Sequence, residues 1–166
     1  MERSTMVKPY ILVYTLLLIF LSGCSSKEVA KPPPVELNRK DSCRICGMII
    51  VDFPGPKAQI HYRDGRIDKF CSVYEMLTYY TQPDRPGGIL AIYVNDMSEA
   101  DWKKPVDHWI DAETAFYVYD PDISGAMGTE IVPFRDRISA ERFMKKHGGR
   151  IVRFKEITPE MLEPRL

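Results

Sequence analysis

The chain contains one succession of elements twice: two short strands, a capped helix and a further strand. In the first copy, residues 58–62 and 66–70 are predicted as strands that flank Asp64-Gly65, a dipeptide typical of tight hairpins. Residues 89–94 are predicted as the last strand of this copy. A hairpin followed by a helix and another strand is a ββαβ unit. We therefore predict an α+β protein with two similar ββαβ units joined by a linker.

The two helices are predicted from their caps and from the spacing of their apolar residues. Ser72 is the expected N-cap of the first helix, and Glu75 stands at the offset of a capping box. Ser139 can cap the second helix. One face of the first helix carries Val73, Met76, Leu77 and Tyr80. One face of the second carries Ala140, Phe143, Met144 and His147. These faces are expected in the core, which gives Met76 and Met144 a packing role.

The remaining strands complete the second copy. Residues 114–119 and 130–134 are predicted as strands around a longer loop, and residues 150–154 as the last strand. Each unit is too small to bury much apolar surface alone, so we expect the units to pack on each other or on the linker. The predicted organisation is a first unit with its linker over residues 41–110 and a second unit with its tail over residues 111–166.

The first 40 residues are predicted to lie outside these units. Arg3 and Lys8 precede an apolar run over residues 10–21, which is too short to span a bilayer comfortably and has the length of a signal h-region. The run ends in Leu21-Ser22-Gly23-Cys24, which resembles a bacterial lipobox. We therefore expect residues 1–23 to be a lipoprotein signal peptide and the thiol of Cys24 to carry a diacylglycerol. An ordinary signal peptide with a chance cysteine is the alternative.

Residues 24–40 would then be a lipidated tether. Consecutive prolines at residues 32–34 favour an extended polyproline II spacer between the lipid and the folded part. The protein is expected outside the cytoplasm, anchored on the periplasmic side, with the outer membrane as the expected membrane. The whole chain has 23 basic and 23 acidic side chains. A charge this close to zero offers no basic field for nucleic acid, so no nucleic-acid partner is expected.

The segment Cys43-Arg44-Ile45-Cys46-Gly47-Met48 has the most distinctive chemistry in the chain. Two cysteines at this spacing can converge on one atom when the chain turns between them, and Met48 adds a thioether. Thiolate and thioether form a soft ligand set that favours copper(I) over hard cations. A second candidate thioether is Met127, which stands on a glycine-rich loop; from the residues alone, packing and function are equally good explanations for it.

Other roles for the cysteines stay open. Without Cys24 three thiols remain, and an odd number excludes a complete disulfide framework. Cys71 precedes a helix N-cap and is either a third metal ligand or a small buried residue. These three cysteines with one histidine could also form a closed zinc site. Cys43 and Cys46 further match the spacing of a redox pair, but residues 47–51 are predicted as a turn into a strand, where a thioredoxin-like site needs a helix.

The histidines are expected in structural positions. His61 lies in a predicted strand and is expected at the surface or at a sheet edge. His108 is expected to make a structural hydrogen bond, and His147 ends a helix, where a cation is favoured.

Short segments along most of the chain carry a family likeness. They are Cys46-Gly47-Met48, Gly55-Pro56-Lys57-Ala58-Gln59-Ile60, Phe70-Cys71-Ser72, Leu90-Ala91-Ile92-Tyr93-Val94-Asn95-Asp96-Met97, Trp109-Ile110-Asp111-Ala112, Gly125-Ala126-Met127-Gly128 and His147-Gly148-Gly149. In this order, after a lipobox, they resemble the NosL family of copper lipoproteins that accompany nitrous oxide reductase. The resemblance implies two ββαβ domains, copper(I) binding and delivery of copper to the reductase, without enzymatic activity.

The resemblance also implies which residues bind the metal. Carried over by residue, Cys46 and Met127 are the first expected copper ligands, and Met48 belongs to the same motif as Cys46. Many relatives lack a counterpart of Cys43, so Cys43 can bind copper, tune the site or form a disulfide with Cys46. The alternative function is that of an extracytoplasmic thiol-disulfide protein that uses Cys43 and Cys46. Met48 and Met127 discriminate between the two, because thioethers serve copper and are irrelevant to disulfide exchange.

Overall fold

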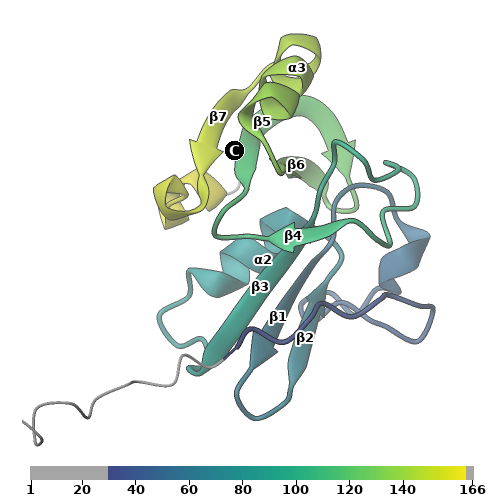
Figure 1. The fold of residues 1–166 in the computed structure, drawn as a ribbon, viewed down its shortest axis with the longest axis vertical. Helices are drawn as coiled ribbons and strands as arrows, with labels where there is room; N and C mark the ends of the chain where they lie inside the picture. Colours follow the sequence, from purple (N-terminus) through teal and green to yellow (C-terminus); the bar gives the residue numbers. More distant parts are fainter. Residues whose placement is uncertain (1–29, 164–166) are drawn as a thin grey trace, which may run out of the picture. The chain divides into compact units, whose positions relative to one another are not determined.

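The computed structural model describes residues 30–163 (Figure 1). Cys24, the predicted signal peptide and the start of the predicted tether lie outside the described residues. Within the described part, none of the helices combines the length and the apolar character that crossing a membrane requires.

The first sheet has four antiparallel strands in the order β2-β1-β3-β4, with helix α2 after β2. The β1–β2 hairpin closes around Asp64-Gly65 as predicted: Gly65 adopts φ +83°, which favours glycine, and the amide of Arg66 donates to Asp64 Oδ1 at 3.0 Å. The elements are β1 (Ala58–Tyr62), β2 (Ile67–Phe70), α2 (Val73–Tyr80), β3 (Ile89–Asn95) and β4 (Trp109–Asp111).

The second sheet has three antiparallel strands in the order β6-β5-β7, and helix α3 connects β6 to β7. Its elements are β5 (Phe116–Gly125), β6 (Gly128–Phe134), α3 (Arg137–His147) and β7 (Arg150–Arg153). The short 3-10 helices are η1 (Ile50–Asp52), η2 (Phe154–Glu156) and η3 (Pro159–Leu162). The ββαβ order therefore occurs twice, and the predicted α+β fold class is confirmed.

Three local expectations were wrong. Asp136, and not Ser139, is the N-cap of α3: its Oδ1 accepts from the amide of Ser139 at 2.9 Å, because a carboxylate is a strong acceptor for the free amides of a first turn. The segment after Gly47 forms a single bridge from Ile49 to Ser42 and then η1, where a strand was expected. The predicted linker supplies β4, which pairs with β3 and extends the first sheet.

The two sheets share one hydrophobic core. It takes Ile60 and Ile92 from the first sheet and Ile131 and Val152 from the second. Helix α2 contacts β1 and β2 and also β6 (Figure 1). The units thus pack on each other, which gives each a partner for the apolar face that it cannot bury alone.

Part of the predicted tether lies along the first sheet. The amide and carbonyl of Val35 both bond to the side chain of Gln59, each at 2.9 Å, and Tyr93 donates its hydroxyl to the carbonyl of Pro32 at 2.7 Å. Lys31 forms an ion pair with Asp111 of β4. Residues 31–35 therefore contact the folded part that was expected to begin near residue 41.

The shared core predicts how the protein unfolds. Phe154 is 5% exposed, and its ring centroid lies 5.1 Å from that of Tyr80 in the first unit and 6.3 Å from that of Tyr117 in the second. Phe154→Ala should lower the free energy of unfolding by about 3–5 kcal/mol, because the cavity opens between both units. Urea unfolding followed by circular dichroism should still show one transition. The control Ile138→Ala, at a side chain 69% exposed, should change little. Two separate transitions would contradict a shared core.

Candidate metal centre

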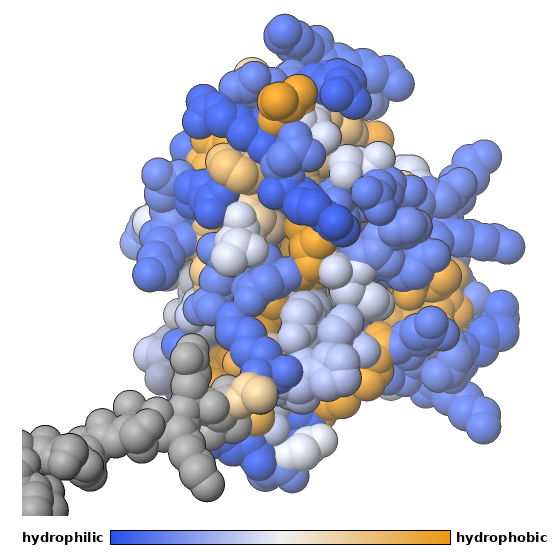
Figure 2. Space-filling view, in the orientation of Figure 1, coloured by the Kyte–Doolittle hydropathy of each residue, from blue (hydrophilic) through white to orange (hydrophobic). Residues whose placement is uncertain are grey.

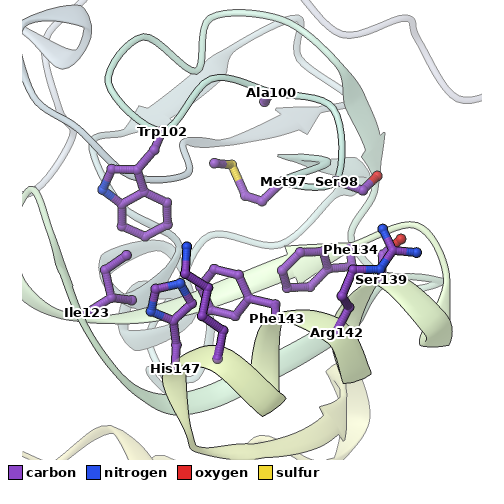
Figure 3. Close-up of a pocket in the computed structure, with 11 residues that line it drawn as sticks. Met97, Ser98, Ala100, Trp102, Ile123, Phe134, Ser139, Arg142, Phe143 and His147 are labelled. Carbon is purple, nitrogen blue, oxygen red and sulfur yellow. The ribbon is translucent and has the colours of Figure 1, made fainter.

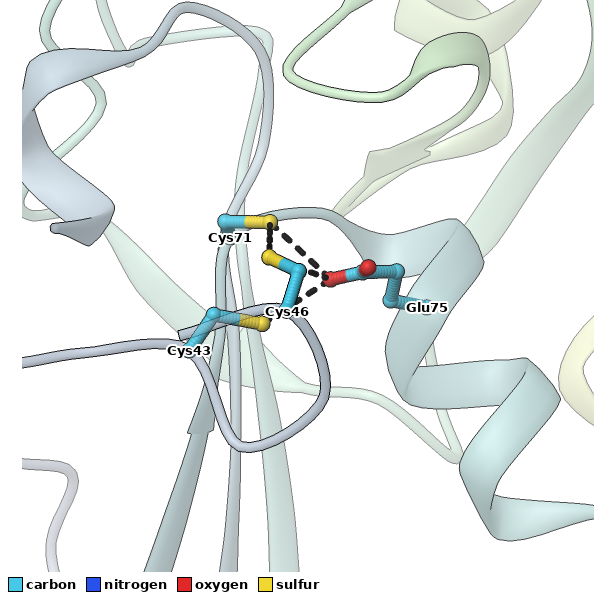
Figure 4. Close-up of side chains that lie close together, drawn as sticks. All are labelled: Cys43, Cys46, Cys71 and Glu75. Atoms are coloured by element: carbon cyan, nitrogen blue, oxygen red, sulfur yellow. Dashed lines mark hydrogen bonds between the residues drawn. The ribbon is translucent and has the colours of Figure 1, made fainter. Parts of the chain in front are cut away.

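Three cysteines and one glutamate converge where β2 ends and α2 begins (Figure 4). The ligand atoms of Cys43, Cys46, Cys71 and Glu75 all lie within 4.8 Å of one another. Cys46 is exposed, whereas the other three are buried. One carboxylate and three sulfur atoms thus surround a point that solvent reaches from the side of Cys46.

A tight turn brings the first two cysteines together, as their spacing predicted. The amide of Cys43 donates to the carbonyl of Met48 at 2.8 Å, and the amide of Gly47 donates to the carbonyl of Cys43 at 3.0 Å. Gly47 adopts φ +73°, a conformation that other residues rarely take. The amide of Arg44 donates to the carbonyl of Lys69 in β2 at 2.8 Å. This bond fixes the turn beside the strand that leads to Cys71.

Glu75 is the member of the site that the sequence analysis missed. Half of the predicted capping box is present, since the amide of Glu75 donates to Ser72 Oγ at 3.0 Å. The carboxylate, however, points to the cysteines: Oε2 lies 2.9 Å from Sγ of both Cys43 and Cys71 and 3.8 Å from Sγ of Cys46. The available signal was an acidic residue one helical turn after a cysteine that precedes the helix.

The four groups share their protons unequally. The pKa of Cys43 is lowered to about 4, chiefly because the neighbouring Cys71 thiol donates a hydrogen bond to its thiolate. The pKa of Cys71 is raised, first by that same hydrogen bond to Cys43 and then by burial. Burial is the main cause that raises the pKa values of Cys46 and Glu75. Cys43 is therefore the member of the site whose pKa is lowered, whereas the pKa values of the other three groups are raised.

The two predicted thioethers are placed differently in the fold. Met48 is half-buried and packs against the apolar group that includes Cys43 and Cys71. Met127 stands at the tip between β5 and β6, and its side chain is 47% exposed. Its neighbour Ala126 packs against the same apolar group. The fold thus carries the tip of the second unit to the cysteines of the first.

Histidine does not take part in the cluster as far as the described residues show. His61 is buried, against expectation. Its Nε2 lies 2.7 Å from Oε1 of Gln59, which gives the buried ring the hydrogen-bond partner that it needs. His108 makes the expected hydrogen bond, to Glu99 at 3.1 Å, and His147 ends α3 beside the ring of Phe143. A zinc site was expected to take a histidine as its fourth group beside the three cysteines. In the structure this group is the carboxylate of Glu75.

A hollow of about 420 Å³ lies elsewhere, between α3 and the loop before β4 (Figure 3). Aromatic rings of Trp102, Phe134 and Phe143 line it together with Met97, and its cationic side chains are Arg142 and Lys146. None of the four clustered groups reaches it.

On the face shown in Figure 2, apolar residues appear as separate patches between hydrophilic ones. The sulfur cluster is thus chemically distinct from these surfaces.

The chain is similar to known copper proteins over most of its length. The NosL family model matches residues 34–162. The copper-binding lipoprotein NosL of Stutzerimonas stutzeri is 41% identical over 155 residues, which cover 92% of this chain and 81% of that protein. The copper-binding lipoprotein NosL of Achromobacter cycloclastes is 35% identical over 150 residues, which cover 87% and 78%.

Solved structures show the same fold. The crystal structure of the copper chaperone NosL from Shewanella denitrificans superposes with a TM-score of 0.74 at 33% identity, over 80% of this chain and 99% of that one. The solution structure of apo-NosL from Achromobacter cycloclastes gives a TM-score of 0.50 at 36% identity, over 64% and 88%.

Proposed function

Because the chain belongs to the NosL family, we propose that it is a lipoprotein that carries copper(I) outside the cytoplasm and delivers it to the copper sites of nitrous oxide reductase. The observation that carries this proposal is the convergence of three cysteine sulfurs and the Glu75 carboxylate within 4.8 Å. Sulfur ligands favour copper(I), which needs only two or three of them. The ion is cargo here, and the protein acts as a carrier without enzymatic activity.

The burial of the site suits transfer. Cys43 and Cys71 are buried, whereas Cys46 and Met127 are exposed. We propose Cys46 and Met127 as the principal ligands, with Cys43, whose pKa is lowered to about 4, and Met48 as further sulfur donors nearby. An incoming ligand can attack the ion from the exposed side before the inner sulfurs release it. Transfer then proceeds by ligand exchange and never leaves the ion bare.

The geometry favours this function over that of a thiol-disulfide enzyme. Cys43 and Cys46 lie in a tight turn closed by Gly47, where a thioredoxin-like site has a helix that begins at its first cysteine. Sγ of Cys46 lies 3.6 Å from Sγ of Cys71, so Cys43 and Cys46 do not form an isolated pair. Three sulfurs and the Glu75 carboxylate gather around one point, which is the arrangement that a metal site requires.

The ligand set can be tested by substitution. Cys46→Ser should lose most copper(I) affinity, because a hydroxyl is a poor ligand for a soft ion. Met127→Leu should weaken binding while preserving side-chain volume. Competition with a copper(I) chelator measures both. Met144→Leu is the matched control, since Met144 packs in the core of the second unit. If Met127→Leu binds as tightly as the parent, the ion is held by Cys43, Cys46 and Met48 of the first unit alone.

The raised pKa values of Cys46 and Cys71 predict how affinity depends on pH. Copper(I) must displace the proton of each protonated thiol that it binds, so affinity should fall as pH falls, by about tenfold per pH unit for each proton released. Cys43, with its pKa lowered to about 4, contributes no such dependence near neutral pH. Chelator competition between about pH 6 and about pH 8 tests this. An affinity that does not change with pH would mean that neither Cys46 nor Cys71 binds the ion. Separately, tighter binding of zinc than of copper(I) would reject copper as the cargo.

The anchor can be tested separately. We propose that Cys24 carries the lipid and that the protein lies on the periplasmic side, held by the outer membrane. Cys24→Ser should release the protein from membranes or leave it unprocessed, because the substituted residue has no thiol for the diacylglycerol. Membrane fractionation and mass spectrometry measure this. Unchanged mass and membrane association in the variant would exclude the lipoprotein assignment.

A further inference from the structure

Two ionisable side chains, a lysine and a glutamate, are fully buried beside the metal centre, one from each half of the fold. Lys57 lies just before β1, and Glu130 lies in β6. Both have a relative exposure of 0%. Burying a charge is costly unless it is well compensated, so a pair retained at this place requires an explanation.

Lys57 holds the backbone next to the cysteine cluster. Its ammonium donates to the carbonyl of Cys71 and to the carbonyl of Pro54, each at 2.9 Å. Its own amide donates to Oδ1 of Asn95 in β3 at 2.7 Å. The side chain thus ties the end of β2, where Cys71 stands, to the loop before β1.

Glu130 reaches the same region from the second unit. Its Oε1 accepts from the amide of Tyr74 at 3.4 Å and from that of Ile131 at 3.1 Å. The first of these amides belongs to the first turn of α2, where a carboxylate is favoured by the helix dipole. Glu130 is therefore bound to helix α2 at Tyr74, the residue directly before Glu75.

The other carboxylate oxygen of Glu130 faces the tip of the β5–β6 hairpin. Oε2 accepts no hydrogen bond from the described residues. A Cβ atom on Gly125 would lie 2.2 Å from this oxygen, and a Cβ atom on Gly55 would lie 3.2 Å from it. Both glycines therefore permit a close approach that a larger residue would prevent. The Glu130 carboxylate touches the tip, the loop before β1 and the start of α2 together.

We propose that Glu130, assisted by Lys57, is a positioning residue that holds the Met127 tip in register with Cys71 and Glu75. No ion pair among the described residues joins the two directly, and each is bound to backbone groups of the site. Burial raises the pKa of the Glu130 carboxyl to about 8 and lowers the pKa of the Lys57 ammonium to about 8. The Met127 tip would then already be in position before copper binds. This inference rests on the proposed role of Met127 as a copper ligand, and it assigns to the second unit a buried group that acts on the site without contacting the ion.

The first experiment measures the tip without metal. Glu130→Gln keeps the shape of the side chain but replaces one carboxyl oxygen with an NH2 group, which must disturb either the acceptor of the Tyr74 amide or the close contact with Gly125. Amide hydrogen exchange over residues 125–129 of the apo protein should become faster, while exchange in β1 and β3 stays as in the parent. Glu141→Gln, an exposed carboxylate of α3 paired with Arg137, is the matched control and should change neither. Unchanged exchange at the tip in Glu130→Gln would overturn the proposal.

The second experiment separates positioning from stability. Copper(I) affinity should fall about 10- to 100-fold in Glu130→Gln, as for other groups that orient metal ligands. Lys57→Met should destabilise the fold because the carbonyls of Cys71 and Pro54 lose the ammonium that donates to them. The double variant Lys57→Met/Glu130→Gln should be no more stable in urea than Lys57→Met and should bind copper(I) no more tightly than Glu130→Gln, because the tip stays unheld. If the loss of affinity across the three variants only follows their loss of stability, the pair is merely structural and the proposal is wrong.

A double-mutant cycle with Met127 distinguishes this proposal from the proposed function. Met127→Leu should cost affinity in the parent and little more in Glu130→Gln, because both act on the same contact. Equal losses in both backgrounds would show that Glu130 does not act through Met127 and would overturn the inference alone. No loss in the parent would remove Met127 from the ligand set. The exchange at residues 125–129 would then decide by itself whether Glu130 holds the tip.

Discussion

The start of helix α2 is the point on which the metal centre depends. A first turn leaves backbone amides without partners inside the helix, and here they are satisfied from two sides. Ser72 accepts one of them, and Glu130 of the second unit accepts another. The carboxylate of Glu75 takes part in neither bond, and it turns toward the three sulfurs. The same few residues thus end a strand, begin a helix, join the two units and supply two groups of the site.

The parts of the structure that could be predicted are those encoded by neighbouring residues. The β1–β2 hairpin follows from Asp64-Gly65, whose backbone requirement only a few residue types meet. The turn that brings Cys43 and Cys46 together follows from their spacing and from Gly47. Strand β4 and the cap of α3 were missed for different reasons. Trp109–Asp111 becomes a strand only because the edge of β3 is available, and Asp136 competes with Ser139 for the same amides with a stronger acceptor.

The metal centre could be predicted only in part because its members come from separate segments of the chain, residues 43–46 and 71–75, with the tip of Met127 further on. Cys71 reaches Cys43 through the bond between Arg44 and Lys69, which depends on how the first turn docks on β2. Glu75 looks like half of a capping box in the sequence, and only the partners of its carboxylate reveal another role. The nearness of the Met127 tip arises from the shared core of the two units. Local patterns contain no information on that contact, and the family resemblance supplied it instead.

Under the proposed function, the arrangement gives the second unit a part in the site. Cys43, Cys46 and Cys71 all belong to the first unit, so a ligand on the second unit would make one side of the site dependent on the packing between the units. That packing rests on the shared hydrophobic core, and close to the site it also includes the buried Lys57 and Glu130 and two glycines that allow the backbones to approach. A partner protein that contacts the exposed tip would then act on the one proposed ligand that the first unit does not hold.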